Sequence, residues 1–188
     1  VGLEIDPFEV EYGRRRLARA FPDRDASQLL CSGDGRALPF ADASFQVVTL
    51  WNVLEHVPQI EDLIGEVSRV LRRDGAVYIV CPNYAADRLE AHYHIPMEGL
   101  VPRDEMVRRL TAEGRDPSFF ETSIHYRTNT EVISALGSAG FAIYDMQNRR
   151  RMDRCLRTLW SRCRAPQDFD AFHDPRRESV MLAARKQR

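Results

Sequence analysis

The sequence lacks several features that would place it in other protein classes. No apolar run comes near the roughly 20 residues that a membrane-spanning helix needs, and no signal-peptide pattern is visible. The formal net charge is −1 at pH 7, so no strong overall field attracts nucleic acid or an anionic membrane. The 4 cysteines show no C-x-x-C spacing, the usual sign of a zinc or redox site. We therefore expect a cytoplasmic protein without a nucleic-acid partner or a membrane span.

Helix and strand signals alternate along the chain, which predicts an α/β fold with a doubly wound, mostly parallel sheet. The length of 188 residues and the apolar content of 44% predict a single domain with a substantial core. The strand candidates are the N-terminal VGLE and residues 29–32, 45–51, 76–82 and 141–146.

Capping signals predict where the helices begin and end. Asp6 and Pro7 provide an N-cap and a first-turn proline for a helix that reaches about Phe21. An apolar stripe over residues 63–71 predicts a helix that Gly75 ends. Thr128 with Glu131 forms a capping box for a later helix, which Gly140 closes.

Acidic residues follow two successive strands. Glu4 closes the first strand, and Asp34 follows the strand at 29–32. In an open α/β sheet the ligand crevice lies beyond the carboxyl ends of the strands, so both carboxylates should face it. The segment from Gly33 to Val57 reads as an acidic turn, a buried strand and a polar strand end. That order predicts an adenosine pocket.

These motifs resemble those of class I S-adenosylmethionine-dependent methyltransferases, in the small-molecule group similar to the ubiquinone methylases (methyltransferase type 11/12). The run LPFADASFQVV, residues 38–48, matches L-P-F-x-D-x-S-F-D-x-V, with Gln46 where Asp is usual. WNVLEHVP, residues 51–58, matches the end of the family's fourth strand. The resemblance covers nearly all of residues 1–148. It implies that the last strand, ESVMLAARK, is antiparallel to the others.

The resemblance also implies a cofactor, an activity and site residues. The cofactor is S-adenosylmethionine, and the enzyme moves its methyl group to an oxygen or carbon of a small-molecule acceptor. Glu4 stands where an acid takes both ribose hydroxyls, and Asp34 with Gly35 stands where the family holds adenine. At the end of the fourth strand the candidate residues are Trp51 and Asn52 for the cofactor and His56 as the catalytic base.

One family element has no counterpart here. The glycine-rich loop that follows the family's first strand is absent, because Gly33-Asp34-Gly35 belongs to a later turn. We therefore expect residues 1–188 to be a partial, N-terminally truncated domain that lacks the first strand and its loop. That strand lies in the middle of the family's sheet, so its absence would leave backbone groups unpaired. Two alternatives stay open: a non-catalytic domain that serves as a partner or scaffold, and a nicotinamide-dependent oxidoreductase.

Two segments outside the common core are the candidates for acceptor binding. Residues 84–127 are expected to form a substrate cap, with His94 and His125 as polar contacts. Residues 149–175 form a basic insertion between the last two strands, and its helix carries Arg150 and Arg154 on one face. These arginines suit an anionic or lipid-linked acceptor, although a solvated face on a packing helix is the plain alternative.

We predict no metal site from the sequence. His92-x-His94 is a lone pair without a third ligand nearby. In the ubiquinone-type O-methylases that this chain resembles, a Glu-x-x-Glu-His run can hold a divalent cation. Here the first position of that run is Asn52, and Glu55 and His56 are expected to order the loop by hydrogen bonds. A cation at Asn52, Glu55 and His56 stays open as an alternative.

Overall fold

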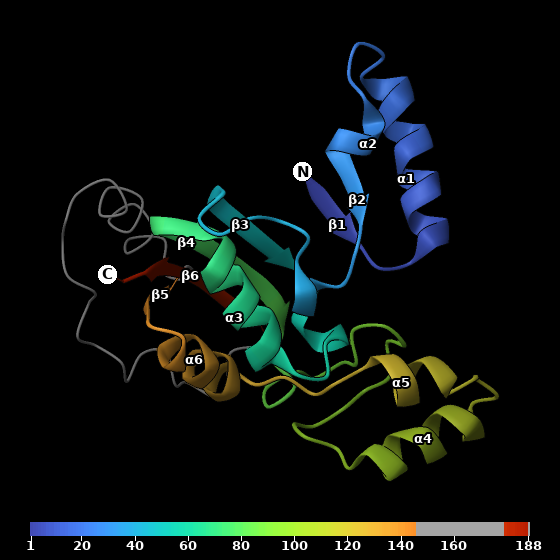
Figure 1. Cartoon of the computed structure of the whole chain (residues 1–188). Coiled ribbons are helices and arrows are strands. Elements are labelled where there is room, and N and C mark those ends of the chain that lie inside the picture. Colours follow the sequence, from blue (N-terminus) through green and yellow to red (C-terminus); the bar gives the residue numbers. More distant parts are fainter. Residues whose placement is uncertain (146–178, 188) are drawn as a thin grey trace.

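The computed structural model describes residues 1–145 and 179–187, and the strands in these residues form two sheets (Figure 1). The smaller sheet pairs two short strands in parallel, β1 (Gly2–Glu4) and β2 (Leu30–Ser32). The larger sheet has the order β3-β4-β6-β5, in which β3 and β4 are parallel and β6 is antiparallel to both neighbours. Its strands are β3 (Phe45–Trp51), β4 (Leu71–Pro82), β5 (Phe141–Asp145) and β6 (Ser179–Lys186).

The predicted α/β class and the antiparallel last strand are confirmed. Among the described residues no strand joins β1 and β2 to β3, so the strands form two sheets. The two sheets part between β1 and β3, which is the place in the family's strand order where the absent first strand belongs. As a result β3 is an edge strand of the larger sheet within the described chain.

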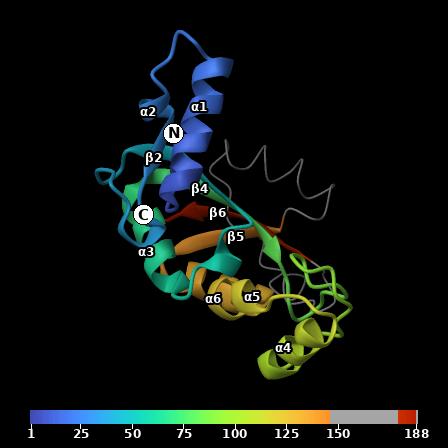
Figure 2. The same ribbon diagram turned by 90° about the vertical axis from the view of Figure 1, so that its right-hand side faces the viewer.

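The helices lie at both ends of the molecule and along the larger sheet. In both views α1 and α4 are at opposite ends (Figures 1 and 2). Among the described residues the α-helices are α1 (Pro7–Ala20), α2 (Ala26–Leu29), α3 (Ile60–Val70), α4 (Arg103–Ala112), α5 (Ser118–Ser123) and α6 (Asn129–Ser138). Two short 3₁₀ turns are η1 (Gly35–Ala37) and η2 (Leu54–His56).

The capping predictions hold for two helices and fail for one. The Asp6 carboxylate accepts a hydrogen bond of 2.7 Å from the Phe8 backbone N–H, and the Thr128 hydroxyl accepts one of 3.2 Å from that of Glu131. Gly75 was expected to end α3, but α3 ends at Val70 and β4 starts at the next residue. Gly75 instead lies where β4 passes β3 closely, because a Cβ there would sit 3.1 Å from the Gln46 carbonyl oxygen.

The main hydrophobic core lies between the larger sheet and the helices α3 and α6. α3 contributes a fully apolar stripe, as its spacing predicts, and residues from α6 and all four strands of the larger sheet complete the cluster. None of the described helices is both long and apolar enough to cross a bilayer. The largest fully buried side chains of this core are Leu54, Ile60, Leu63, Ile64, Leu71 and Ile79.

The LPFADASF motif is held on the protein by two side chains of α3. The Glu66 carboxylate accepts a hydrogen bond of 2.7 Å from the Leu38 backbone N–H. The Arg69 guanidinium donates to the carbonyls of Leu38 and Phe40 at 2.9 and 2.7 Å and to the Asp42 carboxylate at 2.8 Å. This clasp fixes the loop that follows η1, and so it helps to position the acidic turn at the end of β2.

Residues 84–127 carry a second hydrophobic cluster of their own. We call this segment the cap. Its α4 and α5 project away from both sheets (Figure 1). The buried cluster consists of Tyr84, Ile95, Met97, Val101, Met106, Leu110, Phe120 and Ile124. The cap is therefore a packed unit in its own right rather than an extended loop.

Arg127 ties the end of the cap to the sheet. Its side chain is 8% exposed and donates to the carbonyls of Leu54 at 3.1 Å and Pro58 at 3.0 Å, and also to the Val57 carbonyl. It pairs as well with the Glu131 carboxylate in the first turn of α6. A buried guanidinium with this many acceptors holds η2 against the start of α6.

Candidate functional site

Glu4 ends β1, and Asp34 lies in the turn that follows β2, the strand that pairs with β1 in parallel. Glu4 pairs in register with Ser32, and the Gly33 N–H donates to the Glu4 carbonyl at 3.0 Å. The Glu4 Oε1 accepts from the backbone N–H groups of Ile5 and Asp6 at 2.8 and 2.9 Å. Parallel strands in register thus bring Glu4 and the turn that begins at Gly33 together.

Asp34 caps the turn η1 and pairs with Arg36. Its Oδ1 accepts from the Arg36 backbone N–H at 2.9 Å, and the Arg36 guanidinium reaches its Oδ2 at 2.7 Å. The hydrogen bond from the Arg36 side chain lowers the pKa of Asp34, so this carboxylate is anionic at neutral pH. Gly35 is the first residue of η1 and packs closely on α3. A Cβ there would lie only 2.9 Å from the Leu63 Cδ1.

The end of β3 gives the third part of the predicted site. Trp51 is the last residue of the strand and is 60% exposed. Asn52 follows with a φ of +51°, and its N–H donates to the Val80 carbonyl at 2.7 Å. Asparagine adopts this left-handed backbone conformation more readily than most residues. The turn leads the chain directly into η2, which carries Glu55 and His56.

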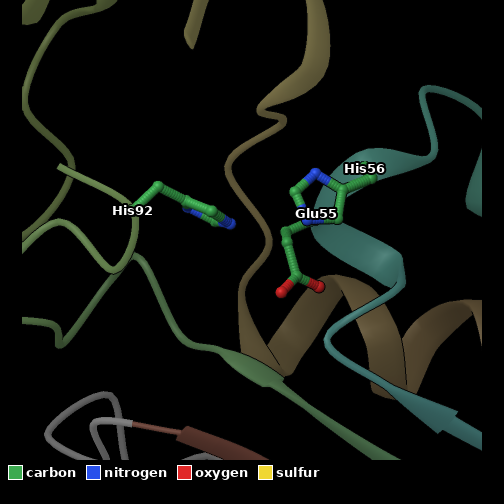
Figure 3. A group of neighbouring side chains, drawn as sticks. All are labelled: Glu55, His56 and His92. Atoms are coloured by element: carbon green, nitrogen blue, oxygen red, sulfur yellow. The ribbon is translucent and has the colours of Figure 1, made fainter. Parts of the chain in front are cut away.

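Three side chains from the core and the cap converge beside η2. Glu55 and His56 come from η2, and His92 comes from the cap (Figure 3). One ligand-type atom from each residue lies within 4.8 Å of those of the other two. The two imidazole rings meet edge to face with centroids 5.0 Å apart. We call this group the Glu-His-His cluster.

Glu55 is the unusual member of the cluster. It is 0% exposed, and neither of its carboxylate oxygens has a hydrogen-bond partner among the described residues. Burial raises its pKa above the ordinary value for a glutamate. A buried carboxylate without partners is costly, so it needs either a proton or a cation.

Both imidazoles of the cluster are oriented by acceptors behind them. His56 Nδ1 donates to the Ser123 carbonyl at 2.8 Å, and His92 Nδ1 donates to the Glu90 carboxylate at 3.0 Å. In each ring Nε2 is therefore the atom that carries the free lone pair. The hydrogen bond to Glu90 raises the pKa of His92.

Glu90 is itself fully held. It is 0% exposed and accepts from the backbone N–H groups of His92 and Tyr93 and from the Tyr84 hydroxyl. Burial alone would raise its pKa, but the hydrogen bonds from His92 and these other donors outweigh burial and lower it. Glu90 is thus an anionic support for the ring of His92.

Neither His94 nor His125 is a member of this cluster. His94 is exposed with a φ of +55°, and the cluster does not include it. His125 is half-buried, and its backbone N–H donates to the Glu55 carbonyl at 2.7 Å. Burial lowers the pKa of its imidazole. Arg150 and Arg154 lie outside the described residues.

Sequence reasoning missed the pairing of His92 with Glu55 and His56. In the sequence His92 pairs naturally with His94, two positions away, but His94 is not part of the cluster. The partners of His92 are more than 30 positions away, and only the packing of the cap against η2 brings them together. No motif of fixed spacing could have indicated this.

Comparison with known proteins agrees with the fold and the motifs. Residues 1–79 match the family model of a methyltransferase domain. The chain is 30% identical over 158 residues to the ubiquinone/menaquinone biosynthesis C-methyltransferase UbiE of Dinoroseobacter shibae, which covers 73% of this chain and 62% of that protein. It is 30% identical over 135 residues to the 27-O-demethylrifamycin SV methyltransferase of Amycolatopsis mediterranei, covering 66% of this chain and 48% of that protein. The chain thus spans less than two thirds of these relatives.

Solved structures give the same fold. The YcgJ protein of Bacillus subtilis superposes with a TM-score of 0.58 at 18% identity, covering 100% of this chain and 82% of that one. An S-adenosylmethionine-dependent methyltransferase from Mesorhizobium loti superposes with a TM-score of 0.57 at 18% identity, covering 98% and 79%. Residues 1–79 thus match a methyltransferase domain, and the chain has the fold of S-adenosylmethionine-dependent methyltransferases, as the motif resemblance predicts.

Proposed function

We propose that this class I methyltransferase chain binds S-adenosylmethionine and serves the transfer of its methyl group to an oxygen or carbon of a small molecule. The observation that carries the proposal is the pair of acidic side chains, Glu4 and Asp34, on one edge of β1 and β2. The names of two relatives support the acceptor atoms, since one is a C-methyltransferase and the other is the methyltransferase of an O-demethyl compound.

The residues present fit the nucleoside half of the cofactor. A carboxylate such as Glu4 can accept from two neighbouring ribose hydroxyls at once, and Asp34 can accept from the adenine amino group. The backbone N–H of Gly35 could donate to the adenine ring, and Trp51 offers an exposed aromatic surface at the end of β3. When bound, S-adenosylmethionine supplies an already activated methyl group, so the protein mainly has to hold, orient and exclude water.

His56 and the cap are the proposed acceptor side. A base is needed only for an unactivated hydroxyl or carbon acid, and the lone pair on His56 Nε2 could take such a proton because Nδ1 is engaged with Ser123. The cap would wall off the acceptor, with His125 fixed to η2 through its backbone and His94 at its exposed surface.

A finer proposal concerns the charge of the acceptor. Arg150 and Arg154 would bind a phosphate or carboxylate on an anionic or lipid-linked acceptor, because guanidinium groups bind such anions bidentately. Exchange of both for glutamate should raise the acceptor KM and leave cofactor affinity unchanged. If neither acceptor kinetics nor liposome binding responds, the basic segment has no part in acceptor recognition.

Calorimetric titration with S-adenosylmethionine tests the main proposal. Glu4→Gln and Asp34→Asn should each weaken binding by about 10- to 100-fold, because each removes a charge-assisted hydrogen bond. Glu9→Gln, an exposed acid in the first turn of α1, is the matched control and should leave affinity unchanged. Equal affinity in all four proteins would show that the pocket lies elsewhere.

The scaffold function is the second candidate, and the break between the two sheets favours it. The β1–β2 pair is not hydrogen-bonded to β3. The position of Glu4 and Asp34 relative to the end of β3 is therefore less firmly fixed than in a continuous sheet. Absence of any cofactor binding by the folded chain would support the scaffold over the enzyme.

A further inference from the structure

We propose that Glu55, His56 and His92 bind one divalent transition-metal cation of the zinc class, between the sheet and the cap. Their ligand-type atoms lie within 4.8 Å of one another, and Figure 3 shows the His92 ring extending from the cap toward Glu55 and His56. In a tetrahedral centre with bonds of about 2.0–2.1 Å, neighbouring ligand atoms are about 3.3 Å apart. Small rotations about the side-chain bonds would bring the three groups to that separation.

The support behind the two imidazoles is of the kind that metal ligands have. A ligating histidine usually donates its other ring N–H to a carbonyl or carboxylate, which fixes the ring and its tautomer. His56 makes this hydrogen bond to the Ser123 carbonyl, and His92 makes it to the buried Glu90 carboxylate. The arrangement leaves Nε2 of both rings available for a cation.

The burial of Glu55 supports a cation at this site independently of the two histidines. It is 0% exposed, and neither carboxylate oxygen has a hydrogen-bond partner among the described residues. A cation held by the two imidazoles would give this carboxylate the opposite charge that its position lacks.

The donor set decides the class of metal. Two imidazole nitrogens and one carboxylate oxygen suit zinc and neighbouring first-row ions, whereas magnesium and calcium prefer oxygen ligands. Three protein ligands also leave one position of a tetrahedral centre open, as in catalytic rather than structural zinc sites.

This ligand set differs from the alternative that the sequence left open. That alternative used Asn52 with Glu55 and His56, all from the end of one strand, whereas here the third ligand is His92 from the cap. The metal would therefore link two separately packed units, the cap and the sheet. Metal binding at this site does not require methyl transfer. In the proposed site His56 is a metal ligand and not a catalytic base.

Zinc titration of the full chain, followed by calorimetry in a buffer that does not bind zinc, tests the site. We expect one Zn²⁺ per chain and no saturable binding of Mg²⁺ at the same concentrations. Glu55→Gln and His92→Ala should each weaken zinc binding by about 100-fold or more, because loss of a direct ligand costs at least as much as loss of its outer-shell partner. Asn52→Gly, which keeps the left-handed turn, and His94→Asn are the controls and should bind zinc like the unaltered chain.

Thermal unfolding gives a second measurement that does not depend on calorimetry. Zinc at about 100 times its Kd should raise the Tm of the unaltered chain by about 5–10 °C, but not that of Glu55→Gln. Without zinc, Glu55→Gln should be at least as stable as the unaltered chain, since it removes a buried charge and keeps the shape. No zinc binding by the unaltered chain, undiminished binding by Glu55→Gln, or binding lost in Asn52→Gly would each overturn the proposal. Cofactor titration of the same proteins separates this outcome from failure of the proposed function.

Discussion

The N-terminal unit, residues 1–32, and the core around the larger sheet are packed very differently. In the N-terminal unit Val10 is the one buried residue, at 4% exposure. Several of its large apolar side chains are open to solvent, with Ile5 62%, Phe8 72% and Phe21 52% exposed. In the core around α3 and α6, by contrast, most apolar side chains are completely buried.

The difference bears on function because the two halves of the candidate site belong to different regions. Glu4 lies in the N-terminal unit and Asp34 in the turn just after it, whereas the Glu-His-His cluster rests on the well-packed core and cap. Few buried contacts mean a low free energy of local opening. The cofactor side of the site should therefore be the easier side to perturb.

Matched phenylalanines give the largest expected contrast. Phe141 in β5 is 5% exposed, so Phe141→Ala should lower the free energy of unfolding by about 3–5 kcal/mol. Phe8 in α1 is 72% exposed, so Phe8→Ala should change it by no more than about 0.5 kcal/mol. Urea denaturation measures both. Similar losses in the two variants would show that the N-terminal unit is packed against something that the described residues do not include.

Amide hydrogen exchange should show the same contrast at the backbone. The amides that β4 donates to its neighbours β3 and β6 should exchange only on global unfolding, while those of β1 and β2 exchange through local opening. We expect at least about 100-fold more protection in β4, which corresponds to about 2.7 kcal/mol. Equal protection in both sheets would contradict the comparison.

The N-cap residues of α1 and α6 allow the same comparison of the two regions with a smaller expected effect. Asp6 caps α1 in the N-terminal unit, and Thr128 caps α6 in the core. Replacement by alanine removes two hydrogen bonds to the first turn at Asp6 and one at Thr128, and each replacement costs about 1 kcal/mol of helix stability. In global unfolding Thr128→Ala should show that cost fully. Asp6→Ala should instead speed exchange of the α1 amides and leave the global midpoint almost unchanged, and a full global loss would mean that α1 unfolds together with the core.

Local signals in the sequence predicted much of the fold. Asp6-Pro7 marked the start of α1, Thr128 that of α6, and the apolar run at 45–51 marked β3, because caps and strands are set by nearby residues. The expected burial of that strand is wrong, since in the described part of the chain β3 is an edge strand in which Leu50 is the one buried residue. Gly75 misled, since its role is a close approach of β4 to Gln46 and not a helix end. A contact between strands cannot be read from one segment alone.

The candidate site divides in the same way. Glu4 and Asp34 could be predicted together because parallel strands end at a common edge. His92 could not be assigned to Glu55 and His56, because that contact depends on how the cap folds back through Arg127 and Ser123. Sequence reasoning thus succeeds where the sheet's regular geometry brings residues together and fails where an insertion does so.

The smallest expected difference concerns two Glu–Arg pairs, one in each region. Glu66 and Arg69 in α3 are 22% and 31% exposed, and Glu66 also holds the Leu38 N–H. Glu11 and Arg15 in α1 are 63% and 73% exposed and contribute almost nothing that can be measured. We expect the Glu66–Arg69 pair in the better packed region to stabilise the fold more than the Glu11–Arg15 pair does.

Acid titration separates the two pairs. The hydrogen bond from Arg69 lowers the pKa of Glu66 in the folded chain below the ordinary value of 4.5. The unfolded chain therefore takes up a proton at Glu66 at higher pH than the folded chain does. The stabilisation is complete above the unfolded pKa and is lost as the pH falls through the folded one. Glu66→Gln should cost up to about 1 kcal/mol at pH 7 and almost nothing near pH 2.5, measured by urea unfolding at each pH. Glu11→Gln, the control, should match the unaltered chain throughout. A Glu66→Gln deficit that persists unchanged in acid would mean that Glu66 acts through its shape and not through its charge.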